Sequence, residues 1–343
     1  MGRRYSLCVL AVLLPAVSAA AQPMYRLTPL GDFGGNYGAA YGINDSGQVV
    51  GWSRYASGPP GTPAPVERAF LWQNGVMQDL GTLGGKSSYA YGINNLGQVV
   101  GHAFDAQNHF HAFIWQDSEM QGLGGDHAYS INDSGQVVGQ WGYRGFLWDN
   151  GTVRYIDAGG ETAARGINNS GLVVGYGAYD AFLWYNGNLW DLGLLPDGVD
   201  GGAFDINNLG HAVGVSWDSS GHAHAVLWRD WERIDLGYLD LPGGRDSLAY
   251  GINDHDQIVG SSRGRGFLWQ DGVMYDLNDC LDNSAAGWSV GAATAINSSG
   301  QIVGSGASPN GFSEAYLLTP IPEPSTLLAL LCGVAGVAWR RRR

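Results

Sequence analysis

The sequence predicts an all-β fold, a seven-bladed β-propeller of four-stranded blades, with an open β-solenoid as the alternative. Three observations predict it. A ten-residue phrase recurs seven times at intervals averaging about 42 residues, a period typical of propellers and solenoids. Short β-branched and aromatic segments follow every copy. Glycine makes up 55 of 343 residues, which suits a chain with many turns.

The recurring phrase predicts the first two strands of each blade. It reads "GINDSGQVVG" from residue 42 and "GINNLGQVVG" from residue 92. We expect a first strand such as "AYGIN", then the polar turn "NDSG", in which Asn or Asp bonds its own backbone and Gly supplies a positive φ. The β-branched segment "QVVGW" is the second strand. The isoleucines of the seven copies are Ile43, Ile93, Ile131, Ile167, Ile206, Ile252 and Ile296.

A second motif, "AFLW" or a close variant, predicts the third strand of each blade. Turns such as Asn74-Gly75 and Asn150-Gly151 then predict a tight hairpin to a fourth strand. Tryptophan closes this motif in six units, and one shared strand position favours packing between blades over sugar stacking. These residues are Trp72, Trp115, Trp148, Trp184, Trp228 and Trp269.

The order of elements predicts that the ring closes. The chain begins with a fourth-strand segment, "YRLTPLGDFGG" from Tyr25, and ends with a third-strand segment, "EAYLLT". The first strand would therefore complete the last blade and remove the exposed sheet edge of an open array. We place the propeller domain at residues 24–319.

The N-terminus predicts export. Residues 1–21 combine Arg3 and Arg4, an apolar stretch and a small-residue cleavage site at Ala19 and Ala21, the composition of a secretory signal peptide. A buried N-terminal helix is the alternative. Without this segment and the C-terminal tail, Cys280 is the only cysteine, so no internal disulfide is expected.

Residues 320–343 predict a sorting tail. Leu327 to Trp339 is 13 residues without charge, about 20 Å as a helix and shorter than the ~30 Å bilayer core. The tail resembles the PEP-CTERM sorting signal of Gram-negative bacteria, or alternatively a plain tail anchor. The matching residues are Pro322, Glu323, Pro324, Arg340, Arg341, Arg342 and Arg343. The resemblance implies a transient transmembrane helix in the inner membrane, an exosortase-type sorting protease as partner, and delivery to the cell surface or extracellular matrix.

The repeats themselves resemble the HAF family of extracellular repeats. The letters "HAF" stand at His111-Ala112-Phe113, and the resemblance covers most of residues 30 to 318. It implies an extracellular location and no catalytic chemistry.

Composition and motifs argue against several functions. Residues 22–321 hold 12 basic and 30 acidic residues, a net charge of −18, which would repel nucleic acid. No catalytic residue is predicted, since no nucleophile, phosphate-binding or zinc motif appears. The pairs His109 with His111 and His222 with His224 fit an exposed strand position better than a metal site. We expect no cofactor, with Ca²⁺ at the "IND" turns of Asp45, Asp133 and Asp254 as the alternative.

These observations predict a non-enzymatic binding or structural component of the extracellular polysaccharide matrix. Its partners would be exopolysaccharide or another surface protein. We expect the ligand on the rim with loops of variable length, of which the segment from Trp52 to Arg68 is among the longest. Trp217 and Trp288, two tryptophans expected in such loops, are the candidate contacts. The alternatives are an extracellular carbohydrate-active enzyme, which needs paired carboxylates or a Tyr or His base, and a calcium-stabilised adhesin.

Overall fold

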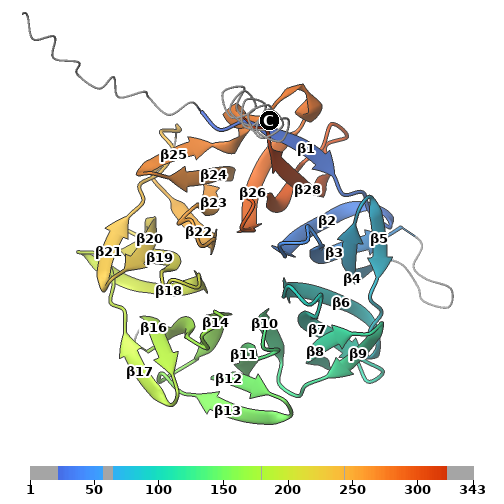
Figure 1. The fold of residues 1–343 in the computed structure, drawn as a ribbon, viewed down its shortest axis with the longest axis vertical. Helices are drawn as coiled ribbons and strands as arrows, with labels where there is room; N and C mark the ends of the chain where they lie inside the picture. Colours follow the sequence, from blue (N-terminus) through green and yellow to red (C-terminus); the bar gives the residue numbers. More distant parts are fainter. Residues whose placement is uncertain (1–21, 57–64, 179, 243, 323–343) are drawn as a thin grey trace, which may run out of the picture.

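The chain forms a ring of seven four-stranded antiparallel sheets in a computed structural model (Figure 1). The structure describes residues 22–56, 65–178, 180–242 and 244–322. Each sheet is one blade, and its first strand lies nearest the central channel. The prediction of an all-β, seven-bladed propeller is confirmed, and the open solenoid is wrong.

The blades are numbered in chain order and their strands run outward from the channel. Blades 1 to 3 are β2 (Gly34–Ile43), β3 (Val49–Tyr55), β4 (Val66–Gln73), β5 (Val76–Asp79); β6 (Gly84–Ile93), β7 (Val99–Asp105), β8 (Phe110–Gln116), β9 (Glu119–Gly122); and β10 (His127–Ile131), β11 (Val137–Trp141), β12 (Arg144–Asp149), β13 (Thr152–Ile156). Blades 4 to 6 are β14 (Ala163–Ile167), β15 (Val173–Gly177), β16 (Asp180–Tyr185), β17 (Asn188–Asp191); β18 (Gly198–Ile206), β19 (Ala212–Asp218), β20 (Ala223–Arg229), β21 (Glu232–Asp235); and β22 (Ser247–Ile252), β23 (Ile258–Ser262), β24 (Arg265–Gln270), β25 (Val273–Asp276).

Blade 7 joins the two ends of the chain. It consists of β26 (Ser289–Ile296), β27 (Ile302–Ala307), β28 (Ser313–Pro320) and, outermost, β1 (Tyr25–Pro29). The antiparallel pairing of β1 with β28 closes the ring, as the order of elements predicts. The 3-10 helices η1 (Leu277–Cys280) and η2 (Asn283–Ala285) precede β26.

The two rims of the ring differ. Short turns join the first strand to the second in every blade and the third to the fourth in blades 1 to 6, and they share one rim, called here the tight-turn rim. The other connections form the variable rim. At the tight turns, Asn44 Oδ1 accepts hydrogen bonds from the backbone N–H groups of Ser46 and Gln48, and Gly47 has a φ of 73°. Asn74 and Gly75 also have positive φ values, so both predicted turn types are confirmed.

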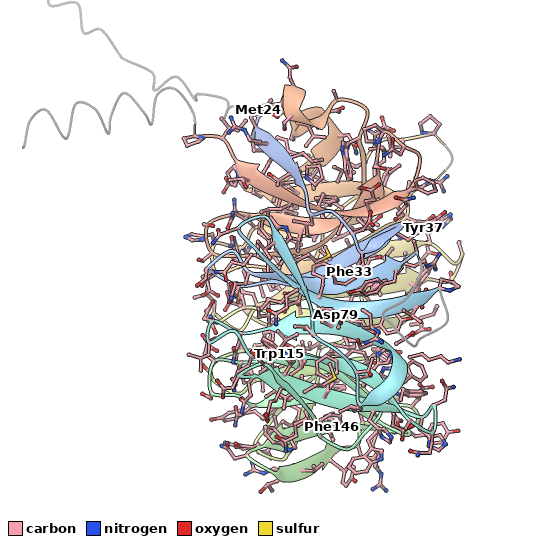
Figure 2. The ribbon with its side chains drawn as sticks, turned by 90° about the vertical axis from the view of Figure 1, so that its right-hand side faces the viewer. Met24, Phe33, Tyr37, Asp79, Trp115 and Phe146 are labelled. Atoms are coloured by element: carbon pink, nitrogen blue, oxygen red, sulfur yellow. The ribbon has the colours of Figure 1, made fainter. Side chains whose placement is uncertain are left out.

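The apolar core lies between neighbouring blades. Trp115 of blade 2 packs with Val50 and Ala69 of blade 1, and Trp184 of blade 4 packs with Val138 of blade 3. In side view, Trp115 lies among the stacked strands (Figure 2). The repeated tryptophans therefore stabilise contacts between blades, as their shared strand position predicts.

Several strands extend beyond their predicted ends. In blade 1, β3 continues to Tyr55 and β4 begins at Val66, although the sequence suggested a loop from Trp52 to Arg68. A cross-strand ion pair supports this extension, because Arg54 lies opposite Glu67 and its guanidinium is 2.9 Å from the Glu67 carboxylate. The variable-rim loops are correspondingly shorter than expected.

Candidate functional site: the central channel

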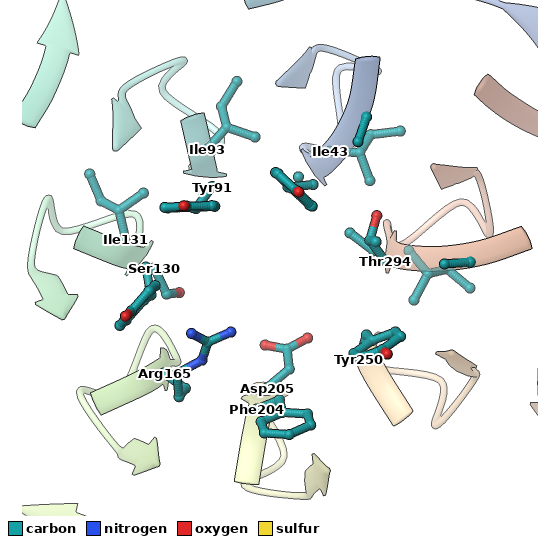
Figure 3. A pocket seen from close by; sticks show the side chains of 18 of the residues that line it. Ile43, Tyr91, Ile93, Ser130, Ile131, Arg165, Phe204, Asp205, Tyr250 and Thr294 are labelled. Atoms are coloured by element: carbon teal, nitrogen blue, oxygen red, sulfur yellow. The ribbon is translucent and has the colours of Figure 1, made fainter. Parts of the chain in front are cut away.

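The channel wall is built by a β-bulge at the same point of every innermost strand. In β2 the register shifts between Ala40 and Gly42, and the other six innermost strands shift at the equivalent position. A bulge leaves one residue unpaired and re-aims its side chain. The seven unpaired residues are Tyr41, Tyr91, Tyr129, Arg165, Phe204, Tyr250 and Thr294, and all seven line one cavity (Figure 3).

This cavity occupies the part of the channel toward the variable rim. Its volume is about 700 Å³, within the range of small-molecule sites. Burial raises the pKa values of Tyr129 and Tyr250 above their ordinary value. Their hydroxyl groups therefore stay protonated at neutral pH and can donate hydrogen bonds. The wall thus offers aromatic faces together with hydroxyl donors.

Arg165 occupies in β14 the place that tyrosine holds in four other blades. Its guanidinium carbon lies 4.1 Å from the ring centre of Tyr129 and 5.8 Å from that of Phe204. Such stacking holds the guanidinium plane in place. Within the described residues, no carboxylate forms an ion pair with Arg165 at 4.0 Å or less.

Asp205 is the one carboxylate among the described residues that line this cavity. It follows the bulge of β18, and its Oδ1 and Oδ2 accept hydrogen bonds from the backbone N–H groups of Ile206 (2.9 Å) and Ile252 (3.0 Å). Burial raises the pKa of Asp205 to about 6, although these two hydrogen bonds act in the opposite direction. Asp205 therefore links blade 5 to blade 6 and changes charge at mildly acidic pH.

Most other blades carry glycine where blade 5 carries Asp205, because the neighbouring backbone is close. A Cβ added to Gly92 would lie 3.0 Å from the carbonyl oxygen of Tyr129 and 3.2 Å from Ser130 Cα. A larger side chain at this position therefore needs a favourable contact with the neighbouring strand. Asp205 makes one, because it accepts a hydrogen bond from the N–H of Ile252.

Two histidines flank the cavity between blades 2 and 3. His127 lines the wall, and its Nδ1 lies 3.3 Å from Nδ1 of the buried His102. Burial, together with the neighbouring His127, lowers the pKa of His102 to about 4, and burial lowers the pKa of His127. Both rings are therefore uncharged at neutral pH, and Arg165 supplies the positive charge of the cavity.

A closed ring of asparagines surrounds the tight-turn end of the channel. Each asparagine donates its Nδ2–H to the backbone carbonyl of the equivalent asparagine in the next blade, at 3.0 to 3.1 Å. The members are Asn44, Asn94, Asn132, Asn168, Asn207, Asn253 and Asn297. They line a second cavity of about 210 Å³ that also touches Asp205.

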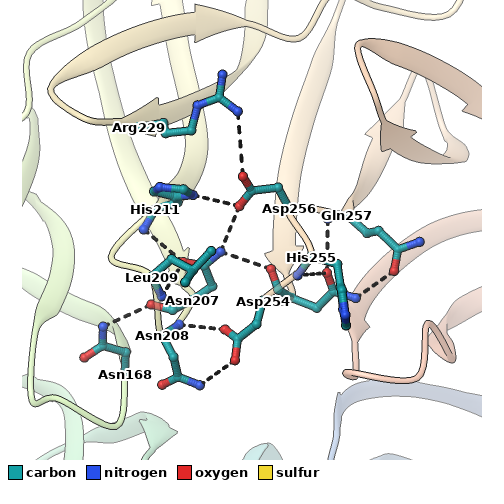
Figure 4. Close-up of polar contacts among 11 residues, drawn as sticks. Asn168, Asn207, Asn208, Leu209, His211, Arg229, Asp254, His255, Asp256 and Gln257 are labelled. Carbon is teal, nitrogen blue, oxygen red and sulfur yellow. Dashed lines mark hydrogen bonds and ion pairs between the residues drawn. The ribbon is translucent and has the colours of Figure 1, made fainter.

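The blade 5 to blade 6 junction departs from this repeat (Figure 4). In five blades a glutamine accepts a second hydrogen bond from the asparagine, as Gln98 does from Asn94. Asn207 has His211 at that position and bonds instead to Asp256 of blade 6 at 3.0 Å. His211 Nδ1 lies 2.7 Å from the same carboxylate. This network adds side-chain contacts between two blades and lies away from the larger cavity.

The two tryptophans predicted as ligand contacts lie apart from this cavity. Trp217 belongs to β19 rather than to a loop, stands at the variable-rim end of that strand and is 36% exposed. Trp288 packs against the blade 7 core cluster that contains Tyr25 and Cys280. Neither residue is among those that line the cavity, so their proposed contact with a ligand stays a prediction.

The histidine pairs and acidic turns have structural partners. His111 Nε2 lies 3.0 Å from an Asp105 carboxylate oxygen, and His224 Nε2 lies 3.5 Å from Asp218. Asp133 accepts from the N–H of Asn95 at 2.8 Å, which connects blades 2 and 3. In the part of the chain that the structure describes, no group of three or more His, Cys, Asp or Glu side chains could hold a metal ion.

The channel residues were not predicted from the sequence, although the repeat contains a signal for two of them. Across the seven phrases, the residue before isoleucine is glycine, serine or alanine except at Asp205, and the residue before that is aromatic or threonine except at Arg165. Charged residues that interrupt a structural repeat at adjacent blades could have marked the site.

The processing residues lie largely outside the described residues. Ala19, Ala21, Glu323, Pro324 and the predicted transmembrane helix belong to that remainder, as do the four C-terminal arginines, whereas Pro322 follows β28. From Gln22 to Pro322, leaving out the residues not described, no helix is long and apolar enough to cross a membrane.

The solved structures that are similar to this chain share little sequence identity with it. The β-propeller domain of the Trilobed protease from Pyrococcus furiosus shares 9% identity with a TM-score of 0.49, covering 84% of this chain and 98% of its own. A gluconolactonase from Xanthomonas campestris shares 11% with a TM-score of 0.43, covering 89% and 94%. A lectin from Aleuria aurantia shares 9% with a TM-score of 0.35, covering 88% and 97%.

One family assignment concerns the tail. No curated protein matches the chain. Residues 320–343 match the PEP-CTERM protein-sorting motif, which confirms the resemblance of the tail. The match lies outside the repeats, so their resemblance to the HAF family stays a prediction. The chain is an exported protein with a seven-bladed propeller and a PEP-CTERM signal, which exosortase recognises for sorting to the cell envelope or surface.

Proposed function

We propose that this protein is a non-enzymatic component of the extracellular matrix that binds a saccharide segment of exopolysaccharide in its central channel. The observation that carries the proposal is the bulge-built wall of the cavity. It presents Tyr41, Tyr91, Tyr129 and Tyr250 to one space of about 700 Å³. Sugar rings combine apolar faces with hydroxyl groups, so aromatic faces and phenolic donors match their chemistry.

The composition of the wall favours binding over hydrolysis. Glycoside hydrolysis by the usual mechanism needs two carboxyl groups on opposite sides of the scissile bond. Asp205 is the single carboxylate of the described cavity wall, and both of its oxygens accept backbone hydrogen bonds. The carboxylates of the acidic turns likewise serve as links between blades, so the proposal includes no resident metal.

Calorimetry on the protein purified after export tests the proposal, with the producing cell's own exopolysaccharide as the probe. We expect saturable binding that Tyr250→Ala weakens at least tenfold, because the variant removes one aromatic face and one hydroxyl donor. Trp231→Ala is the matched control, since Trp231 is 64% exposed in a turn of the tight-turn rim.

Two results would contradict the proposal. Equal effects of the two substitutions would place the saccharide outside the channel. New chain ends or ultraviolet-absorbing unsaturated sugars in the recovered polysaccharide would show hydrolysis or elimination, and would favour the alternative of a carbohydrate-active enzyme.

A further inference from the structure

We propose that Arg165 selects a ligand that carries a carboxylate, and that the ligand is an otherwise neutral saccharide with an isolated uronic acid residue. This inference rests on the proposed saccharide-binding function and names the chemical class of the saccharide. Its starting point is the interruption of a ring of aromatic and hydroxyl side chains by one guanidinium.

The guanidinium is held in place and free to bind an anion. Tyr129 of blade 3 and Phe204 of blade 5 lie on either side of Arg165 along the ring, with their ring centres 4.1 Å and 5.8 Å from its guanidinium carbon. In the described region its charge has no carboxylate partner within 4.0 Å. A fixed guanidinium presents paired N–H donors that match the two oxygens of a carboxylate.

The nearest candidate partner is already engaged. Asp205 lies on the adjacent blade and points into the same cavity (Figure 3). Its two oxygens accept the N–H groups of Ile206 and Ile252, and burial raises its pKa. Asp205 therefore bonds to the backbone through both oxygens and forms no ion pair with Arg165 within 4.0 Å, so the guanidinium stays available to a carboxylate supplied by the ligand.

The remaining charges restrict the ligand to an isolated carboxylate. The cavity wall contains one guanidinium, and neutral His127 adds no positive charge. Residues 22–321 carry a net charge of −18, which repels a polyanion over the rest of the surface. A single uronic acid in a neutral chain pairs with Arg165 and leaves the neighbouring sugars for the tyrosines.

Four probes separate the inference from the function on which it rests. We would titrate the exported protein with glucuronosyl-glucose, its neutral counterpart cellobiose, sodium acetate and long-chain polygalacturonate. We expect glucuronosyl-glucose to bind more tightly than the other three. Arg165→Gln should weaken its binding roughly ten- to hundredfold, the contribution of a charge-assisted hydrogen bond, while cellobiose binding stays unchanged.

Arg144→Gln is the matched control. Arg144 is an exposed arginine that lies above the Tyr155 ring at the variable rim, and it is not among the residues that line the cavity. Arg165→Lys keeps the charge and should retain part of the affinity, which guards against a Gln variant that fails to fold. Cellobiose bound as tightly as glucuronosyl-glucose would overturn the carboxylate inference and leave the saccharide function standing. Equal binding of acetate would indicate a small free carboxylate, and tighter binding of polygalacturonate a polyanion; either result overturns the inference. If neither the four probes nor exopolysaccharide bound, the result would contradict both the carboxylate inference and the saccharide-binding function.

Discussion

The asparagine ring predicts the largest single-residue effect on stability outside the apolar core. Asn168 gives the cleanest test, because Leu172 stands where five blades have a glutamine that accepts a second bond from the asparagine. Its Oδ1 accepts from the N–H groups of Ser170 (3.1 Å) and Leu172 (3.0 Å), and its Nδ2 donates to the carbonyl of Asn207 (3.0 Å). The side chain is buried.

Asn168→Ala removes all three bonds and leaves their partners behind. The Asn207 carbonyl keeps its hydrogen bond from the Gly210 N–H (3.1 Å), so the loss of the Asn168 donor should cost about 0.5–1.5 kcal/mol, and the loss of the acceptor for each of the two partly buried turn N–H groups about 0.5–1.5 kcal/mol. We therefore expect the free energy of unfolding to fall by about 3 kcal/mol. Equilibrium urea denaturation of the exported protein, followed by tryptophan fluorescence, measures this change as a lower midpoint.

Two neighbouring substitutions make this prediction specific. Asn168→Asp keeps the acceptors of the turn but replaces the donor by a buried carboxylate oxygen that faces the Asn207 carbonyl, so it should cost about 1–3 kcal/mol through the lost bond and the new repulsion. Asn169→Ala removes exposed contacts, among them the bond to Asp133 at 2.9 Å, and should cost less than about 1 kcal/mol. If Asn168→Ala were no worse than Asn169→Ala, the ring would not stabilise the propeller and the reasoning would be refuted.

Three further predictions concern the closure of the ring by β1, the charge of Asp205 and the close approach of Gly92 to the next blade. Leu27→Ala in β1 should lower the free energy of unfolding by about 2–5 kcal/mol, as much as Ile156→Ala in β13 does, because both residues are buried in outermost strands; a much smaller effect in urea denaturation would mean that β1 does not close the ring. The pKa of Asp205 is raised to about 6 from its ordinary 3.8, so its neutral form stabilises the folded protein fully below pH 4, and about 3 kcal/mol of this stability is lost as pH rises through 6. Asp205→Asn should abolish this pH dependence in thermal melts between pH 4 and 7. An unchanged pH dependence in the variant would contradict the assignment. Gly92→Val should cost about 1–3 kcal/mol by overpacking, seen as a lower melting temperature, and an unchanged melting temperature would show that the neighbouring strand yields freely.

The number of blades and the closure of the ring could be predicted from the sequence because both follow from local chemistry. The polar turn after Ile43 and the Asn74-Gly75 hairpin specify their backbone within a few residues, and seven copies fix the count. The fourth-strand segment at Tyr25 is out of phase with the repeat, which predicts pairing with the last blade.

The channel wall depends on long-range geometry that no single repeat contains. The bulge at Tyr41 arises from the pairing of β2 with β3, and the same letters could form a regular strand. Arg165 meets Tyr129 and Phe204 only in the folded ring, because the three residues belong to three different blades. Trp217 illustrates the opposite error, because a tryptophan outside the repeat looked like a loop residue, whereas β19 extends through it.

The closing pair of strands also sets the rim of the propeller from which the chain continues toward its sorting signal. β28 ends and β1 begins at the tight-turn rim, where the Ile321 N–H donates to the Met24 carbonyl at 2.8 Å. The last described residue, Pro322, shares a cavity there with Ser298 and Gly300. The chain therefore continues toward its sorting signal from the tight-turn rim, which is the end of the propeller opposite the variable rim. Closure of the ring and departure of the chain toward the sorting signal share one strand pair at this rim.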